Sequence, residues 1–255
     1  MILELDHIVV AFFVLLRTSA FFLGLPYVIG QMVPKPLQTG FAVLVTVLLV
    51  PFIPIDQAQP AMLQNYVGII LLGVNEVLIG ILMALTVRMV YYGLEVAGHV
   101  TSMEIGLVRN ESLNPFGVQG SMISSVLFYF AIILSFASGL HYLILDAFSQ
   151  SFFLLPIGKP ILSIHNFDAF LAETSTIFRI GLLISAPFIA LSLTINLVLA
   201  VLGKAAPKIN VFMTSFAVRI LAGVAMFVSS ILLIKGYIMQ YLYRTPENLL
   251  IFLEN

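Results

Sequence analysis

Between Ser121 and Leu145 the chain runs through SMISSVLFYFAIILSFASGLHYLIL without one Asp, Glu, Lys or Arg. A helix that crosses a bilayer takes about 20 apolar residues, so this run is long enough to be one. Further apolar runs cover residues 8–32, 40–55, 66–87, 180–203 and 209–242. No linker or change of composition divides the chain. The runs predict a single all-α domain over residues 1–255, in a polytopic integral membrane protein with about six hydrophobic helical segments.

Charged residues make up only 9% of the chain, whereas soluble domains carry about 25%. So few charges cannot cover the surface of a soluble protein, which leaves a lipid-embedded protein or the core of an apolar complex. The net charge of −1 offers no electrostatic footprint for nucleic acid. The N-terminus opens with Glu4 and Asp6 instead of a positively charged region, and we expect it to be retained, not cleaved as a signal peptide.

Four charged residues interrupt the apolar runs: Arg17, Glu76, Arg219 and Lys235. Each costs about 2.5–3.5 kcal/mol in lipid unless it is paired or faces a cavity. We expect Arg17 and Glu76 to form a structural ion pair, with a proton relay through Glu76 as the alternative. Arg219 has no acid at a neighbouring depth, so we expect it to face a partner subunit or a wet pore, in a structural or gating role.

Prolines suggest that two of the segments are broken, because proline removes a helical hydrogen bond. Pro51 and Pro54 end the run over 40–55, and Pro187 lies inside the run over 180–203. Lys and Arg are divided almost evenly between the two sets of loops, so the positive-inside rule does not choose an orientation. This weak bias indicates that assembly with partners sets the final location.

A polar central stretch, Leu94–Gly120, separates the third and fourth runs. Its titratable groups are Glu95, His99, Glu104, Arg109 and Glu111. Five glycines in and beside it and the Asn114-Pro115 turn signal accompany them. Such a segment is either a loop in water or irregular backbone that lines a cavity enclosed by protein.

Catalytic and metal-binding patterns are missing from the sequence. His99 has Glu95 and Glu104 nearby but no third ligand at a useful spacing, and no HExxH pattern occurs. There is no GxSxG, Walker or GxGxxG motif. We therefore expect no enzyme activity, no metal and no cofactor.

Several motifs follow one another in a specific order and spacing: Arg17-Thr-Ser-Ala-Phe-Phe, Glu76-Val-Leu-Ile-Gly80, Glu104-Ile-Gly-Leu107, Gly139-Leu-His141, Leu155-Pro156-Ile-Gly158 and Gly203-Lys-Ala-Ala-Pro-Lys-Ile-Asn-Val-Phe212. With this order the chain resembles, nearly end to end, the FliR family of flagellar biosynthetic proteins. The flagellar pattern fits better than that of the virulence relatives, which show Asp-X-Gln-Arg-Gly where this chain has Ser102–Gly106.

The resemblance implies a subunit of the flagellar type III protein export gate, located in the bacterial inner membrane at the flagellar basal body. The family forms kinked hairpins and assembles with FliP-type and FliQ-type subunits, and with an FlhB-type subunit, into the channel for unfolded flagellar proteins. A virulence type III secretion gate is the alternative. A proton-coupled small-molecule transporter that uses Glu76 and Arg17 is a further one, although it predicts an inverted repeat that the sequence does not clearly contain.

The resemblance also implies that the loop after the third apolar run projects into the closed pore as a plug. Its residues are Glu104, Ile105, Gly106, Leu107, Val108, Arg109, Asn110, Glu111, Ser112, Leu113, Asn114 and Pro115. Arg109 and Glu111 replace positions that are apolar in the family. These charges leave open whether this plug seals by apolar contact.

Overall fold

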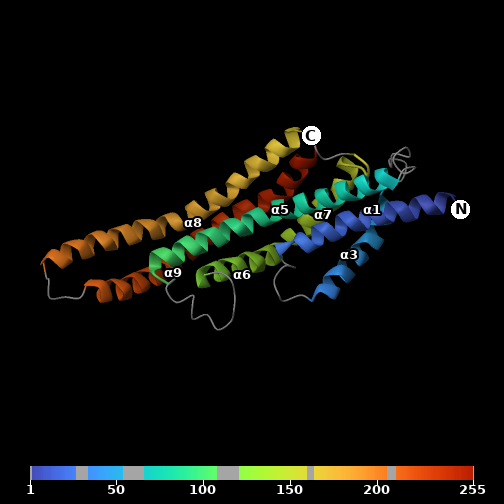
Figure 1. Ribbon diagram of the computed structural model, residues 1–255. Coiled ribbons are helices and arrows are strands. Elements are labelled where there is room, and N and C mark those ends of the chain that lie inside the picture. Colours follow the sequence, from blue (N-terminus) through green and yellow to red (C-terminus); the bar gives the residue numbers. More distant parts are fainter. Residues whose placement is uncertain are drawn as a thin grey trace. The chain divides into compact units, whose positions relative to one another are not determined.

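A computed structural model describes residues 2–26, 34–53, 66–107, 121–159, 164–205 and 211–254 (Figure 1). All regular elements within these ranges are helices, as the sequence predicts. They are α1 (Ile2–Gly24), α3 (Lys35–Leu49), the short 3-10 helix η1 (Val50–Phe52), α5 (Tyr66–Ile105), α6 (Met122–Ala137), α7 (Leu140–Leu154), α8 (Ile164–Ala205) and α9 (Val211–Glu254). By length and composition α5, α8 and α9 are long and apolar enough to cross a membrane, and α6 with α7, bent by 76°, is either one broken span or a re-entrant loop.

The chain divides into two compact units. Unit 1 comprises Met1–Met89, Ser138–Thr174 and Tyr243–Asn255, and unit 2 comprises Val90–Ala137 and Ser175–Leu242. The long helices α5, α8 and α9 each contribute residues to both units. In unit 1 the core is aromatic, with the rings of Phe21 and Phe148 stacked at 4.3 Å between centroids.

Small residues set the contact between α1 and α5 in unit 1. A Cβ atom on Gly80 would lie 2.5 Å from the carbonyl oxygen of Arg17, and one on Gly24 would overlap Ala84. Arg17 is thus paired with Gly80, and Gly24, further along α1, is paired with Ala84, further along α5. The two helices therefore run in the same direction. Glycine permits this close approach because it has no side chain to displace the neighbouring backbone.

In unit 2 glycines again mark the close contacts. A Cβ on Gly98 of α5 would overlap the backbone of Ser124 in α6, and one on Gly223 of α9 would meet Ile105. On α8 and α9, the Phe188 and Phe227 rings lie 6.2 Å apart. The last part of α5 is therefore packed against both α6 and α9.

The structure corrects three expectations about helix boundaries. Residues 94–105 continue α5, so the first half of the polar stretch Leu94–Gly120 is regular helix and not irregular backbone. The run over 121–145 is interrupted at Ser138 and Gly139, with Gly139 left-handed at φ +73°. Pro187 lies inside an unbroken α8. By contrast, α3 ends just before Pro51, as predicted.

Candidate functional site

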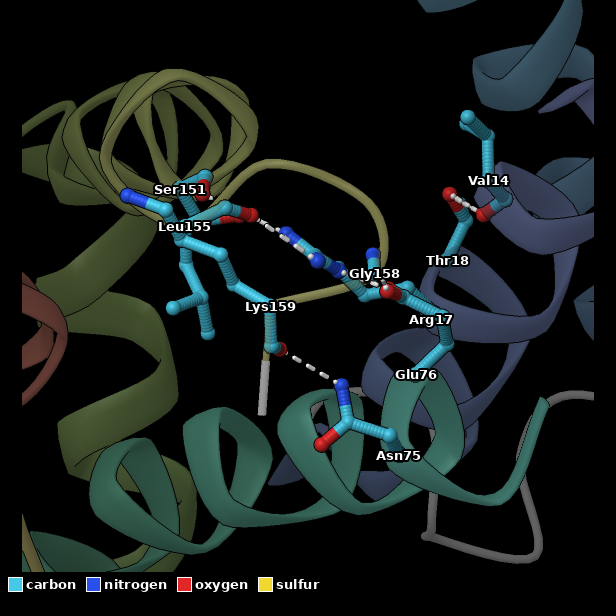
Figure 2. A network of polar contacts seen from close by, with 9 residues as sticks. All are labelled: Val14, Arg17, Thr18, Asn75, Glu76, Ser151, Leu155, Gly158 and Lys159. Carbon is cyan, nitrogen blue, oxygen red and sulfur yellow. Dashed lines mark hydrogen bonds and ion pairs between the residues drawn. The ribbon is translucent and has the colours of Figure 1, made fainter. Parts of the chain in front are cut away.

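The most polar buried cluster in the described part of the chain is built on Arg17 of α1 and Glu76 of α5 (Figure 2). Arg17 Nε donates to Glu76 Oε2 at 2.6 Å. Both side chains are 0% exposed, so neither charge is shared with solvent. The ion pair expected from the sequence is thus present, and it lies wholly within unit 1.

Arg17 also holds the C-terminal end of α7. Its Nη1 donates to the carbonyl oxygen of Ser151 at 3.2 Å, and its Nη2 donates to that of Leu155 at 3.0 Å. The C-terminal end of a helix carries partial negative charge, so a cation there is favourable, and the Ser151 carbonyl accepts the Leu155 N–H at 2.9 Å as well. The guanidinium also lies over the Phe152 ring, 4.4 Å from its centroid. Figure 2 shows the guanidinium between these carbonyls and Glu76.

The turn after α7 closes the cluster from the other side. The Gly158 N–H donates to Glu76 Oε1 at 3.5 Å, and the Lys159 N–H donates to the Pro156 carbonyl at 3.1 Å. Gly158 has φ +98°, a conformation that suits glycine. Next to Glu76, Asn75 donates through Nδ2 to the Lys159 carbonyl at 2.9 Å. The motif Leu155-Pro156-Ile-Gly158 thereby presents its backbone to both members of the ion pair.

Chemically, this arrangement is a clamp between three elements. Both carboxylate oxygens of Glu76 are engaged, and the planar guanidinium of Arg17 bonds three acceptors through three different nitrogens, a spread that the compact ammonium of a lysine does not have. Across the residues that the structure describes, no group of three His, Asp or Glu side chains is placed to hold a metal ion. Sequence reasoning found the pair but missed its backbone partners, although the Leu-Pro-x-Gly turn signal was visible.

Arg219, the third charge in an apolar run, lies in unit 2. Its Nη2 donates to Oδ1 of Asn196 on α8. It forms no ion pair with any residue inside the described ranges. Sequence reasoning looked for an acid and overlooked this amide partner.

The predicted plug begins where α5 ends. Glu104 is half-exposed and Ile105 is buried in the last turn of α5. The Gly106 N–H bonds the Met103 carbonyl at 3.1 Å and the Leu107 N–H bonds that of Ser102 at 2.9 Å. With Gly106 at φ +85°, these bonds form a Schellman motif, which stops a helix. Val108, Arg109, Asn110, Glu111, Ser112, Leu113, Asn114 and Pro115 lie outside the described residues.

Comparison with known proteins places this chain in a family. Residues 8–245 match the model of the bacterial export proteins, family 1. The chain is 26% identical over 240 residues to the flagellar biosynthetic protein FliR of Escherichia coli K12, a match that covers 94% of this chain and 90% of the relative. It is 26% identical over 250 residues to the Caulobacter vibrioides protein of that name, with 96% of each chain covered. For the Bacillus subtilis protein the identity is 26% over 244 residues, with 93% of each chain covered.

Proposed function

The chain belongs to the bacterial export proteins, family 1, and on that premise we propose that it is a subunit of the flagellar type III protein export gate in the bacterial inner membrane. It assembles there with FliP-type and FliQ-type subunits, and with an FlhB-type subunit, into the channel for unfolded flagellar proteins. Its relatives from Escherichia coli and Bacillus subtilis carry flagellar names, which favours a flagellum over a virulence apparatus.

The observation that carries the assembly is the length of the exposed apolar surface on α8 and α9. Exposed apolar side chains run from Leu171 to Leu202 on α8 and from Met213 to Tyr243 on α9. At 1.5 Å per residue each of these stretches is about 45 Å long. The hydrocarbon core of a bilayer is about 30 Å thick. Lipid therefore covers only part of this surface if the helices are upright.

Tilting does not remove the excess. A helix would have to lean by about 50° to bring a stretch of about 45 Å within the hydrocarbon, whereas spanning helices lean by at most about 40°. Apolar surface left in water has to be covered by protein, because large exposed apolar patches mark interaction sites. This geometry favours a member of a hetero-oligomer over a lone transporter.

The ion pair of Arg17 and Glu76 has the role of a structural clamp in this proposal. A proton relay or a proton-coupled transporter needs a carboxylate that exchanges protons with water. Glu76 is fully buried and both of its oxygens accept hydrogen bonds. These contacts favour the clamp over the transporter.

The loop over residues 104–115 is the plug of the closed pore in this proposal. The Schellman motif at Gly106 supports the position of its first residues, because it stops α5 and turns the chain out of the helix. Arg109 and Glu111 then supply the polar part of the seal.

Co-expression tests the assembly. The chain is produced with tagged FliP-type and FliQ-type subunits of its own organism, extracted in mild detergent, and weighed by native mass spectrometry. We expect a complex in which the three proteins occur at unequal stoichiometry. A stable monomer in the presence of both partners contradicts the proposal, and substrate uptake by the protein alone in liposomes favours the transporter.

A further inference from the structure

The charges of this chain are unevenly distributed along the sequence. Between Glu173 and Glu247 there is no Asp or Glu, although this segment carries six of the 11 Lys and Arg residues. They are Arg179, Lys204, Lys208, Arg219, Lys235 and Arg244. All 12 acids lie elsewhere. The parts of α8 and α9 that lie between these two glutamates therefore form a cationic surface without an acid of its own.

Arg219 lies within the apolar part of this surface. Asn196 meets Arg219, and Phe188 meets Phe227, so α8 and α9 are antiparallel and Asn196 and Arg219 share one level. The side chains that flank this level on the two helices are apolar and exposed: Leu193, Leu197, Phe216 and Leu221. Whatever covers these residues, lipid or protein, also excludes water from the guanidinium.

The hydrogen bonds of Arg219 are incomplete. Nη2 donates to the neutral amide of Asn196, but Nε is shielded from solvent and has no acceptor among the residues that the structure describes. Arg17, in unit 1, shows what a buried arginine obtains in the same chain: a carboxylate and two carbonyls. A neutral amide satisfies one donor and leaves the positive charge uncompensated, which is costly in an apolar environment.

We propose that Arg219 is a docking point for a partner subunit, and that the partner supplies an Asp or Glu from an apolar helix packed against α8 and α9. The proposal rests on the proposed function, since it names a contact within the export gate. The carboxylate approaches the half-buried guanidinium of Arg219 from the side that this chain leaves open, and the exposed residues on either side pack against the apolar face of the same helix. Asn196 holds the guanidinium ready for this contact.

The position of Arg219 favours a side chain over a lipid headgroup. Eight residues separate it from the start of α9, about 12 Å along the helix, and exposed apolar residues lie on both sides of it, from Met213 to Leu233. Headgroup phosphates lie at the ends of an apolar stretch and not within it. The guanidinium also bonds sideways to Asn196, at its own level, instead of reaching toward an end.

A charge-swap experiment tests the site. R219E is co-expressed with the FliP-type and FliQ-type subunits, and the recovered complex is compared with that of the wild-type chain. We expect recovery to fall by about tenfold or more, because close charge pairs at interfaces couple by at least about 1.5 kcal/mol. R244E is the matched control, since Arg244 is an exposed arginine on the same helix that lies beyond Tyr243, the last residue of the exposed apolar stretch. Its recovery should stay within about twofold of wild type.

The rescue arm separates docking from a mere folding defect. Each Asp or Glu within the apolar helices of the two partners is changed to Lys in turn, in the presence of R219E. One such change should restore the complex, and a folding defect within this chain would not respond to it. Wild-type recovery with R219E, or a loss that no change restores, overturns the proposal. If the wild-type chain itself recovers no partner, the proposed function fails instead.

Discussion

Arg17 is fixed by more than its ion pair, because the carbonyls of Ser151 and Leu155 also bind it. Glu76→Gln removes the only counter-charge that a fully buried cation has among the described residues, and it should destabilise the protein by about 3–5 kcal/mol. Thermal unfolding of the purified protein in detergent measures the loss. Exposed Arg179→Met is the control and should change stability by no more than about 0.5 kcal/mol. An unchanged midpoint for Glu76→Gln would show that the pair does not hold unit 1 together.

At the Arg17–Glu76 site, the sequence predicted the contact that depends on side-chain charge, which is the ion pair itself. Arg17 and Glu76 each need a counter-charge in an apolar run, and each is the obvious partner of the other. The carbonyls of Ser151 and Leu155 could not be predicted in this way. Every residue carries a carbonyl, and only the folded chain determines which carbonyls lie near Arg17. Asn196 was missed for a related reason, since a search for acids passes over a neutral amide.

The contact between α1 and α5 also depends on a glycine, Gly80, because the two backbones approach closely there. Gly80→Ala would place a methyl group 2.5 Å from the Arg17 carbonyl oxygen, so the helices must separate, at a cost of about 1–3 kcal/mol. Gly236→Ala on α9 is the matched change, because it meets nothing within 4 Å and should stabilise its helix by about 0.5–1 kcal/mol. Unfolding midpoints of the isolated variants should shift in opposite directions. Equal shifts would count against the close approach.

Helix existence could be predicted from the sequence, but helix boundaries could not. Gly98 and Gly139 are equally good helix breakers by residue type. Gly98 nevertheless lies inside α5 against Ser124, whereas Gly139, with φ +73°, separates α6 from α7. Pro187 remains inside α8. Glu95 and His99 are polar and follow the apolar run over 66–87, yet α5 continues through both of them. In each case packing in the folded chain decides between the two outcomes, and the local sequence permits both.

For the whole molecule, these continued helices change how the protein relates to a bilayer. Apolar runs of about 20 residues suggested helices of bilayer length, whereas α5, α8 and α9 have 40, 42 and 44 residues. Helices of this length are about 60–66 Å long, about twice the hydrocarbon thickness.

The last prediction concerns the closed channel, which only the assembled gate possesses. Deleting Arg109–Leu113 shortens the proposed plug beyond the helix stop at Gly106, so the complex should assemble normally and conduct more ions than wild type. Conductance of the purified complex in planar bilayers measures this, alongside native mass spectrometry of its subunits. Replacement of the same five residues by Gly and Ser keeps the length and removes the charges of Arg109 and Glu111. If only the deletion raises the ion conductance, the length and bulk of the loop seal the pore. If the Gly and Ser replacement raises it as well, the charged side chains contribute to the seal. Unchanged conductance in the deletion contradicts the plug, whereas loss of the complex shows that these residues serve packing.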